Sequence, residues 1–296
     1  MRVGAWSRCA VLAFGLAGCA HRAPQPGAVP APHGIEAAEL LARGRGVPTP
    51  GPLAAGVRVT LASGLSARGS LLVAPGGRVR LDVAGPIGGP LLSVVTDGTR
   101  GWAWTARDGR WTLAPELDAE LSALAPGAGL APLGRMLLGL LPDTAGRALE
   151  ADPHGAVVAW DGPAGRSLVG WVDPSSARLR RLALRAGGGV AEGGGPPYAP
   201  ASGDVSLEVV PAEAPPHLPA RIVVEMGEDP VTVEVIGWSA ADPPASAFTW
   251  APPAGAVVRT VHLQPDGRLG ARSVRGTAGS PGAPPPPSAP APAPSP

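Results

Sequence analysis

The residues that could carry out acid–base or metal chemistry are scattered along the 296-residue chain. Glu116, Asp118 and Glu120 fit the first turn of a helix, where negative charge complements the helix dipole. The sequence contains no nucleophile elbow, dinucleotide-binding loop, P-loop or zinc-protease motif. The chain has five histidines, and none of them has a neighbour at the spacing of recognised metal-ligand motifs. They are His21, His33, His154, His217 and His262. The sequence therefore predicts a protein that is not an enzyme, with no catalytic residue, metal site or cofactor.

A cysteine near the N-terminus indicates a different chemistry, the covalent attachment of lipid. Residues 1–18 combine a basic start with a short apolar run, the pattern of a signal peptide. The segment Leu16-Ala17-Gly18-Cys19 resembles the lipobox of bacterial lipoproteins, whose cysteine thiol is acylated before cleavage makes it the new N-terminus. We therefore predict a lipoprotein signal peptide over residues 1–18 and lipidation of Cys19. An ordinary secretory signal with a chance cysteine is the alternative.

The residue after the cysteine indicates where such a lipoprotein would reside. An aspartate at this position favours retention in the inner membrane, and the chain has Ala20 instead. We therefore expect the protein at the periplasmic face of the outer membrane, held in its lipid by the acylated Cys19. Lipidation of bacterial lipoproteins usually adds three acyl chains, and each buried CH₂ contributes roughly 0.8 kcal/mol, so this anchoring would be effectively permanent. The remainder of residues 19–34 is rich in proline and predicts an extended spacer.

Composition separates an ordered middle from the two ends of the chain. There are 43 Gly and 39 Pro, yet 45% of the residues are hydrophobic and the mean hydropathy is +0.15, too apolar for a chain that stays unfolded. We expect one folded domain over residues 35–263 and a disordered Pro/Ala/Ser-rich tail over residues 264–296. Only 16% of the residues are charged, with 24 basic against 23 acidic, which excludes a typical nucleic-acid-binding protein.

Alternation of apolar and polar residues dominates the expected domain. Val57–Leu61 and Arg78–Val83 show the period of two, and Asp97-Gly98 is a tight-turn signal between such segments. This pattern predicts an antiparallel sheet with one apolar face. Leucines recur at helical spacing within Glu116–Leu124 and Leu130–Leu141, which predicts a helical insert against that face.

Several segments of this sheet also resemble a known family. They are RLDVAGPIGGPLL at residues 80–92, the Asp97-Gly98 turn, the helix at residues 133–141 with the Pro142-Asp143 that follows, and FTWAPPAGA at residues 248–256. In this order, behind a lipobox, they resemble the LolB/LolA-like family of outer-membrane lipoprotein receptors and carriers. The resemblance implies a mainly β fold, an unclosed antiparallel barrel of about eleven strands with helices over its concave apolar face.

The resemblance also implies roles for particular residues. In LolB a hydrophobe in a tight loop helps to deliver cargo into the membrane, and the matching loop here is Pro86-Ile87-Gly88. Packing of Ile87 against its own sheet is the alternative. The candidate walls of a lipid cavity are Val79, Leu81, Val83, Leu92, Val94, Trp102, Trp104, Leu133, Leu137 and Leu140. For the tryptophans and the leucines, ordinary core packing explains the same pattern.

Together these features predict an anchored lipid-binding protein. It would receive acyl chains of lipoproteins or other lipids in an apolar cavity, as a monomer, and help to place lipoproteins in the outer membrane. A periplasmic LolA-like carrier is the expected delivery partner. The alternative is a scaffold lipoprotein of an envelope complex that uses the same fold with a filled core.

Overall fold

The computed structural model describes residues 37–85, 88–106, 109–125, 127–152, 155–162, 166–185, 205–212, 217–226, 230–253, 256–263 and 269–274. The predicted signal peptide, Cys19, the spacer, Pro86 and Ile87 lie outside these residues. Among the helices within them, none is both long and apolar enough to span a membrane.

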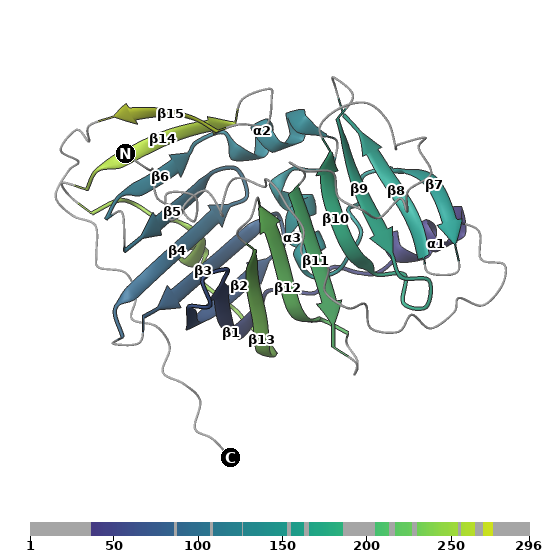
Figure 1. Ribbon diagram of the computed structural model, residues 1–296, viewed down its shortest axis with the longest axis horizontal. Helices are drawn as coiled ribbons and strands as arrows, with labels where there is room; N and C mark the ends of the chain where they lie inside the picture. Colours follow the sequence, from purple (N-terminus) through teal and green to yellow (C-terminus); the bar gives the residue numbers. More distant parts are fainter. Residues whose placement is uncertain are drawn as a thin grey trace, which may run out of the picture.

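One large sheet forms the body of the protein (Figure 1). Its strands in spatial order are β15-β14-β6-β5-β4-β3-β2-β1-β13-β12-β11-β10-β9-β8-β7, and β14 with β6 is the one parallel pair among the described residues. The outermost strands, β15 and β7, do not pair with each other, so the sheet is unclosed. The mainly β, open antiparallel architecture expected from the sequence is confirmed, with fifteen described strands in place of about eleven.

The strands are β1 (Leu53–Leu61), β2 (Ser66–Ala74), β3 (Arg78–Ala84), β4 (Pro90–Asp97), β5 (Gly101–Thr105), β6 (Trp111–Ala114), β7 (Arg147–Asp152), β8 (Gly155–Asp161), β9 (Ser167–Val172), β10 (Leu179–Arg185), β11 (Val205–Pro211), β12 (Pro219–Met226), β13 (Val231–Ala240), β14 (Val258–Leu263) and β15 (Leu269–Val274). Strand β15 lies inside the predicted tail, so the boundary at residue 264 is wrong. Paired with β14 along its whole length, β15 satisfies backbone groups that a free tail would leave to water.

Residue alternation and turn chemistry explain why these segments form strands. In β1, Val57 and Val59 are buried while Arg58 between them is exposed. The β4–β5 turn is fixed by Asp97, whose carboxylate accepts hydrogen bonds from the backbone N–H groups of Thr99 and Arg100 at 2.9 and 2.7 Å. Gly98 follows with φ of +96°, in the region that favours glycine. The Asp97-Gly98 turn predicted from the sequence is therefore present.

Three α-helices lie in the described part of the chain: α1 (Ala37–Arg45), α2 (Leu117–Leu124) and α3 (Leu130–Leu137). Figure 1 shows α2 and α3 between the β4–β6 part and the β10–β12 part of the sheet. The second predicted helix was expected to reach Leu141, but α3 ends at Leu137. Gly139 has φ of +70°, so the chain turns away there before Pro142 is reached.

The outer face of the sheet carries a second, thinner layer. The 3₁₀ helix η4 (Ala245–Phe248) contacts β3 and β4, and Phe248 is only 1% exposed. The guanidinium of Arg78 lies 5.3 Å from the centre of the Phe248 ring, and Arg80 donates a hydrogen bond to the carbonyl oxygen of Ala247 at 3.1 Å. The described start of the FTWAPPAGA segment, residues 248–253, thus lies on the convex side of the sheet.

Candidate functional site

A cavity of about 530 Å³ lies between the concave face of the sheet and helices α2 and α3. Aliphatic side chains make up most of its wall, and the lining within the described ranges includes no charged side chain. The lining residues are Val59, Leu61, Leu65, Ala67, Leu71, Gly77, Val79, Leu81, Val83, Leu91, Leu92, Val94, Thr96, Thr105, Ala106, Leu121, Leu130, Leu133, Gly134, Leu137, Leu168, Leu182, Leu184, Leu207, Ile222, Val224, Val231 and Val233.

Period-two alternation places side chains of β3 and β4 on the cavity wall. Leu81 of β3 is opposite Val94 of β4, and Val83 is opposite Leu92. Since successive residues of a strand point to opposite faces, the residues between them point to the convex side. These pairs form a continuous aliphatic surface in the middle of the sheet.

The other wall comes from strands far along the chain. Leu182 and Leu184 of β10, Ile222 of β12 and Val233 of β13 line the same cavity as Leu81. Helix α2 contributes Leu121, which belongs to one buried cluster with Leu124 and Ala103 of β5. The cavity thus depends on the curvature of the sheet, which brings two sequence-distant halves to face each other.

The two threonines of the wall are compatible with an apolar surface. Thr96 donates a hydrogen bond to the carbonyl oxygen of Gly77 at 2.6 Å and accepts one from the N–H of Val79 at 2.9 Å. Its hydroxyl group is therefore engaged within the sheet, and Thr105 is not without an interaction partner either.

Close contact between α3 and the β2–β3 turn closes one end of the cavity. Gly77 has φ of +75°, and a Cβ atom there would lie 2.4 Å from the backbone carbon of Leu130. Only glycine allows this approach of helix to turn. At the opposite end of β2, Leu65 directly precedes the strand, lines the cavity and is 41% exposed. Leu65 therefore marks the opening.

Arg135 fastens α3 to the segments beside it. Its side chain is 10% exposed, donates hydrogen bonds to the carbonyl oxygens of Leu141 at 2.8 Å and Val47 at 3.3 Å, and also bonds the hydroxyl of Thr49. Asp143 lies 3.3 Å from it as an ion-pair partner. A planar guanidinium can serve several acceptors at once, so this residue ties α3 to the chain that follows α1.

Most of the predicted cavity residues are on the observed wall. These are Val79, Leu81, Val83, Leu92, Val94, Leu133 and Leu137. Leu140 is not among them: it is 2% exposed in the main core, because α3 ends before it and its side chain no longer follows the helical face. Of the predicted membrane loop, Gly88 is exposed, whereas Pro86 and Ile87 lie outside the described residues.

The prediction that Trp102 and Trp104 line the cavity is wrong. Their cross-strand partners are Val95 and Ser93, whereas Val94 on the cavity side is opposite Ala103. The alternation correctly puts both tryptophans on one face, but that face is the convex one. There the Trp102 ring centre lies 5.3 Å from that of Trp250.

Two further aromatic contacts extend this convex cluster. The rings of Trp111 and Trp250 stack at 3.2 Å between centres, and Trp104 lies 5.8 Å from Trp111. Aromatic packing of this kind fastens the segment before β14 to the sheet.

The part of the wall formed by β10 to β13 was not among the predicted cavity residues. The alternating apolar residues at 222 and 224 and at 231 and 233 carried the signal for that wall. Without the sheet order, however, nothing indicated that they face the same space as β3 and β4.

Fold and site together define an open antiparallel β-sheet protein with an apolar cavity covered by helices. No protein-family model and no curated protein sequence matches the chain. Among solved structures, it is similar to a LolA superfamily protein from Nitrosomonas europaea, with TM-score 0.44 and 13% identity over 73% of this chain and 99% of that one. An uncharacterized conserved protein from Thermus thermophilus gives TM-score 0.34 and 13% identity over 76% of this chain and 98% of that one.

Proposed function

We propose that this protein binds acyl chains of lipids in the cavity between its curved sheet and helices α2 and α3. The observation that carries the proposal is the aliphatic wall around about 530 Å³ of space. Ligand pockets commonly have volumes of roughly 300–1,000 Å³. Transfer of hydrocarbon from water into such a space supplies the driving force, about 0.8 kcal/mol per CH₂, and needs no catalytic residue.

The size of the cavity restricts how much hydrocarbon can enter. A methylene group is about as large as a water molecule, whose share of liquid volume is about 30 Å³. A cavity of about 530 Å³ therefore holds about 17 such groups, the length of one common fatty acyl chain. The other chains of a lipid with several chains, and any headgroup or protein, would remain outside.

The finer parts of the proposal rest on the sequence. Cys19 would carry the lipid anchor in the outer membrane, with the domain facing the periplasm, and Ile87 would help to deliver cargo to the membrane. A periplasmic LolA-like carrier would supply the acyl chains, and the receptor would act as a monomer. In this scheme the protein places lipoproteins in the outer membrane and performs no enzymatic step.

The test is lipid extraction and probe binding with a chain that starts at Ala20. The purified protein is extracted for mass spectrometry and titrated with a fluorescent fatty acid. We expect co-purified lipid and saturable binding of one probe per chain. Absence of both would contradict the proposal and favour the scaffold alternative. In the anchored protein, Ile87→Glu should lower delivery to membranes and leave probe binding unchanged; equal loss of both would place Ile87 in the fold instead.

A further inference from the structure

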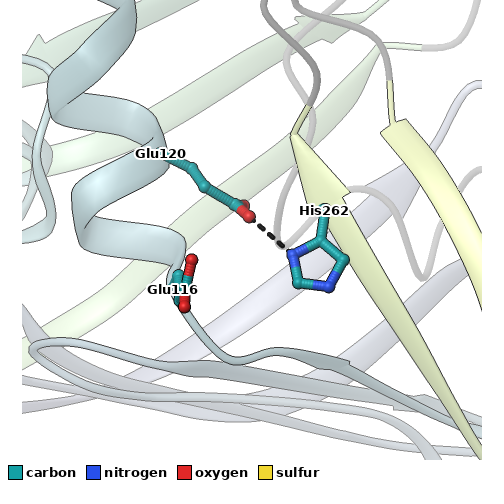
Figure 2. A group of neighbouring side chains, drawn as sticks. All are labelled: Glu116, Glu120 and His262. Carbon is teal, nitrogen blue, oxygen red and sulfur yellow. Dashed lines mark hydrogen bonds and ion pairs between the residues drawn. The ribbon is translucent and has the colours of Figure 1, made fainter.

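A polar cluster joins α2 to β14 outside the cavity. Figure 2 shows the carboxylates of Glu116 and Glu120 beside the imidazole of His262. Nδ1 of His262 lies 2.9 Å from a carboxylate oxygen of Glu120, and one possible ligand atom from each of the three residues lies within 4.8 Å of the others. Glu120 and His262 are 142 residues apart in the sequence, so the fold and not the local sequence brings the histidine to the two glutamates.

The placement of Glu116 is not explained by helix capping. It occupies the N-cap position of α2, yet its side chain makes no capping hydrogen bond. Glu120 lies one helical turn later, so the two like charges repel each other, although the dipole of α2 favours each of them. A cation between them and His262 would remove that repulsion.

We propose that Glu116, Glu120 and His262 bind one divalent transition-metal ion, with Zn²⁺ as the best fit. Imidazole nitrogen with carboxylate oxygens suits zinc, whereas Mg²⁺ and Ca²⁺ prefer oxygen alone. Zinc bonds to nitrogen and oxygen are about 2.0–2.2 Å, so two ligand atoms on one ion are at most about 4.4 Å apart. The His262 side chain is 45% exposed, so a small rotation brings the donors into range, and water can fill the remaining position.

The ion would fasten a cavity helix to the sheet. Glu120 is followed by Leu121, which lines the cavity, and β14 packs against α2 through the buried Val261. Zinc would therefore hold Leu121 in place over the apolar space. Any effect on acyl-chain uptake rests on the proposed function, whereas binding of the metal itself does not.

The experiment is calorimetric titration of ZnCl₂ into the full chain, purified without a histidine tag. Cys9→Ser and Cys19→Ser are present throughout, so that no thiol binds zinc. We expect one zinc ion per chain and at least about tenfold weaker binding for both Glu116→Gln and His262→Asn. The matched controls Glu39→Gln, in the first turn of α1, and His217→Asn should stay within twofold. Excess zinc should also raise the Tm by roughly 5 °C, and this rise should vanish in Glu116→Gln.

Three results would overturn the assignment. They are the absence of saturable zinc binding, zinc binding that survives Glu116→Gln and His262→Asn, and equal competition by Mg²⁺. Should His262→Asn fail to fold, Glu116→Gln decides the question alone, because its side chain makes no capping bond whose loss would unfold α2. Failure of acyl-chain binding would leave the zinc titration unchanged, so the two proposals fail separately.

Discussion

The dependence of affinity on chain length is the sharpest consequence of the cavity. Each methylene added to a saturated fatty acid should contribute about 0.8 kcal/mol, or roughly a fourfold lower Kd. From ten to sixteen carbons the Kd should therefore fall by about three and a half orders of magnitude. The gain should stop near 17 carbons, because about 530 Å³ holds about that many methylene-sized groups.

Leu81→Trp tests whether this limit belongs to the cavity. Leu81 lies in the middle of the wall, opposite Leu71 and Val94. The larger ring adds roughly six non-hydrogen atoms, so the gain should end near about 11 carbons and palmitate should bind at least about tenfold more weakly. The matched control is Leu72→Trp on the neighbouring strand, which alternates to the convex face and should leave the series unchanged.

The assay is displacement of a fluorescent fatty acid by saturated acids of eight to twenty carbons, kept below the concentrations at which they form micelles. Circular dichroism and Tm measurements establish that both variants are folded. An affinity that does not depend on chain length would refute the reasoning. So would an identical shift of the limit in Leu81→Trp and Leu72→Trp, because the hydrocarbon would then bind elsewhere.

Three further predictions concern stability. Burial raises the pKa of Asp173, but hydrogen bonds from Ser175, Ser176 and Arg180 lower it to about 2. The ionised carboxylate therefore stabilises the fold above pH 4, and this stabilisation is lost as the pH falls towards 2. Asp173→Asn should lower the free energy of unfolding by about 2 kcal/mol at pH 7. In urea titrations between pH 4 and 2, the free energy of unfolding of this variant should depend less on pH than that of the wild type. Trp111→Ala removes the stack on Trp250 and should lower the free energy of unfolding by about 2 kcal/mol, with palmitate affinity unchanged in the displacement assay. Arg135→Leu leaves the carbonyl oxygens of Leu141 and Val47 without this donor and should lower the free energy of unfolding by about 3 kcal/mol. A loss below about 1 kcal/mol in urea titrations would show that water replaces the guanidinium.

Local patterns predicted much of the sheet because strand formation depends on alternation and turn residues. Arg78–Val83 and the Asp97-Gly98 turn are examples in which the segment, its period and its boundary all follow from neighbouring residues. The end of α3 was missed since Pro142 is the obvious terminator in the sequence, whereas the left-handed Gly139 ends the helix earlier. The presence of a glycine in the sequence does not show whether its φ angle is positive in the folded chain.

For the candidate sites too, the local sequence pattern predicted one part and tertiary packing decided the rest. Alternation put Leu81 and Val94 on one face, and it put Trp102 and Trp104 on one face, but it could not tell which face is concave. The convergence of His262 with Glu116 and Glu120 has no signal in the sequence, because it arises from the packing of α2 on β14.

The sequence by itself determined the strand-rich class, the tight turns and the apolar helices, since these depend on residues a few positions apart. Only the tertiary structure decided that the β3–β4 part of the sheet faces the β10–β12 part. It thereby formed a cavity of about 530 Å³ between strands separated by about a hundred residues or more. The physical reason is that curvature and strand order are properties of the whole sheet, set by the burial of its apolar face against α2 and α3.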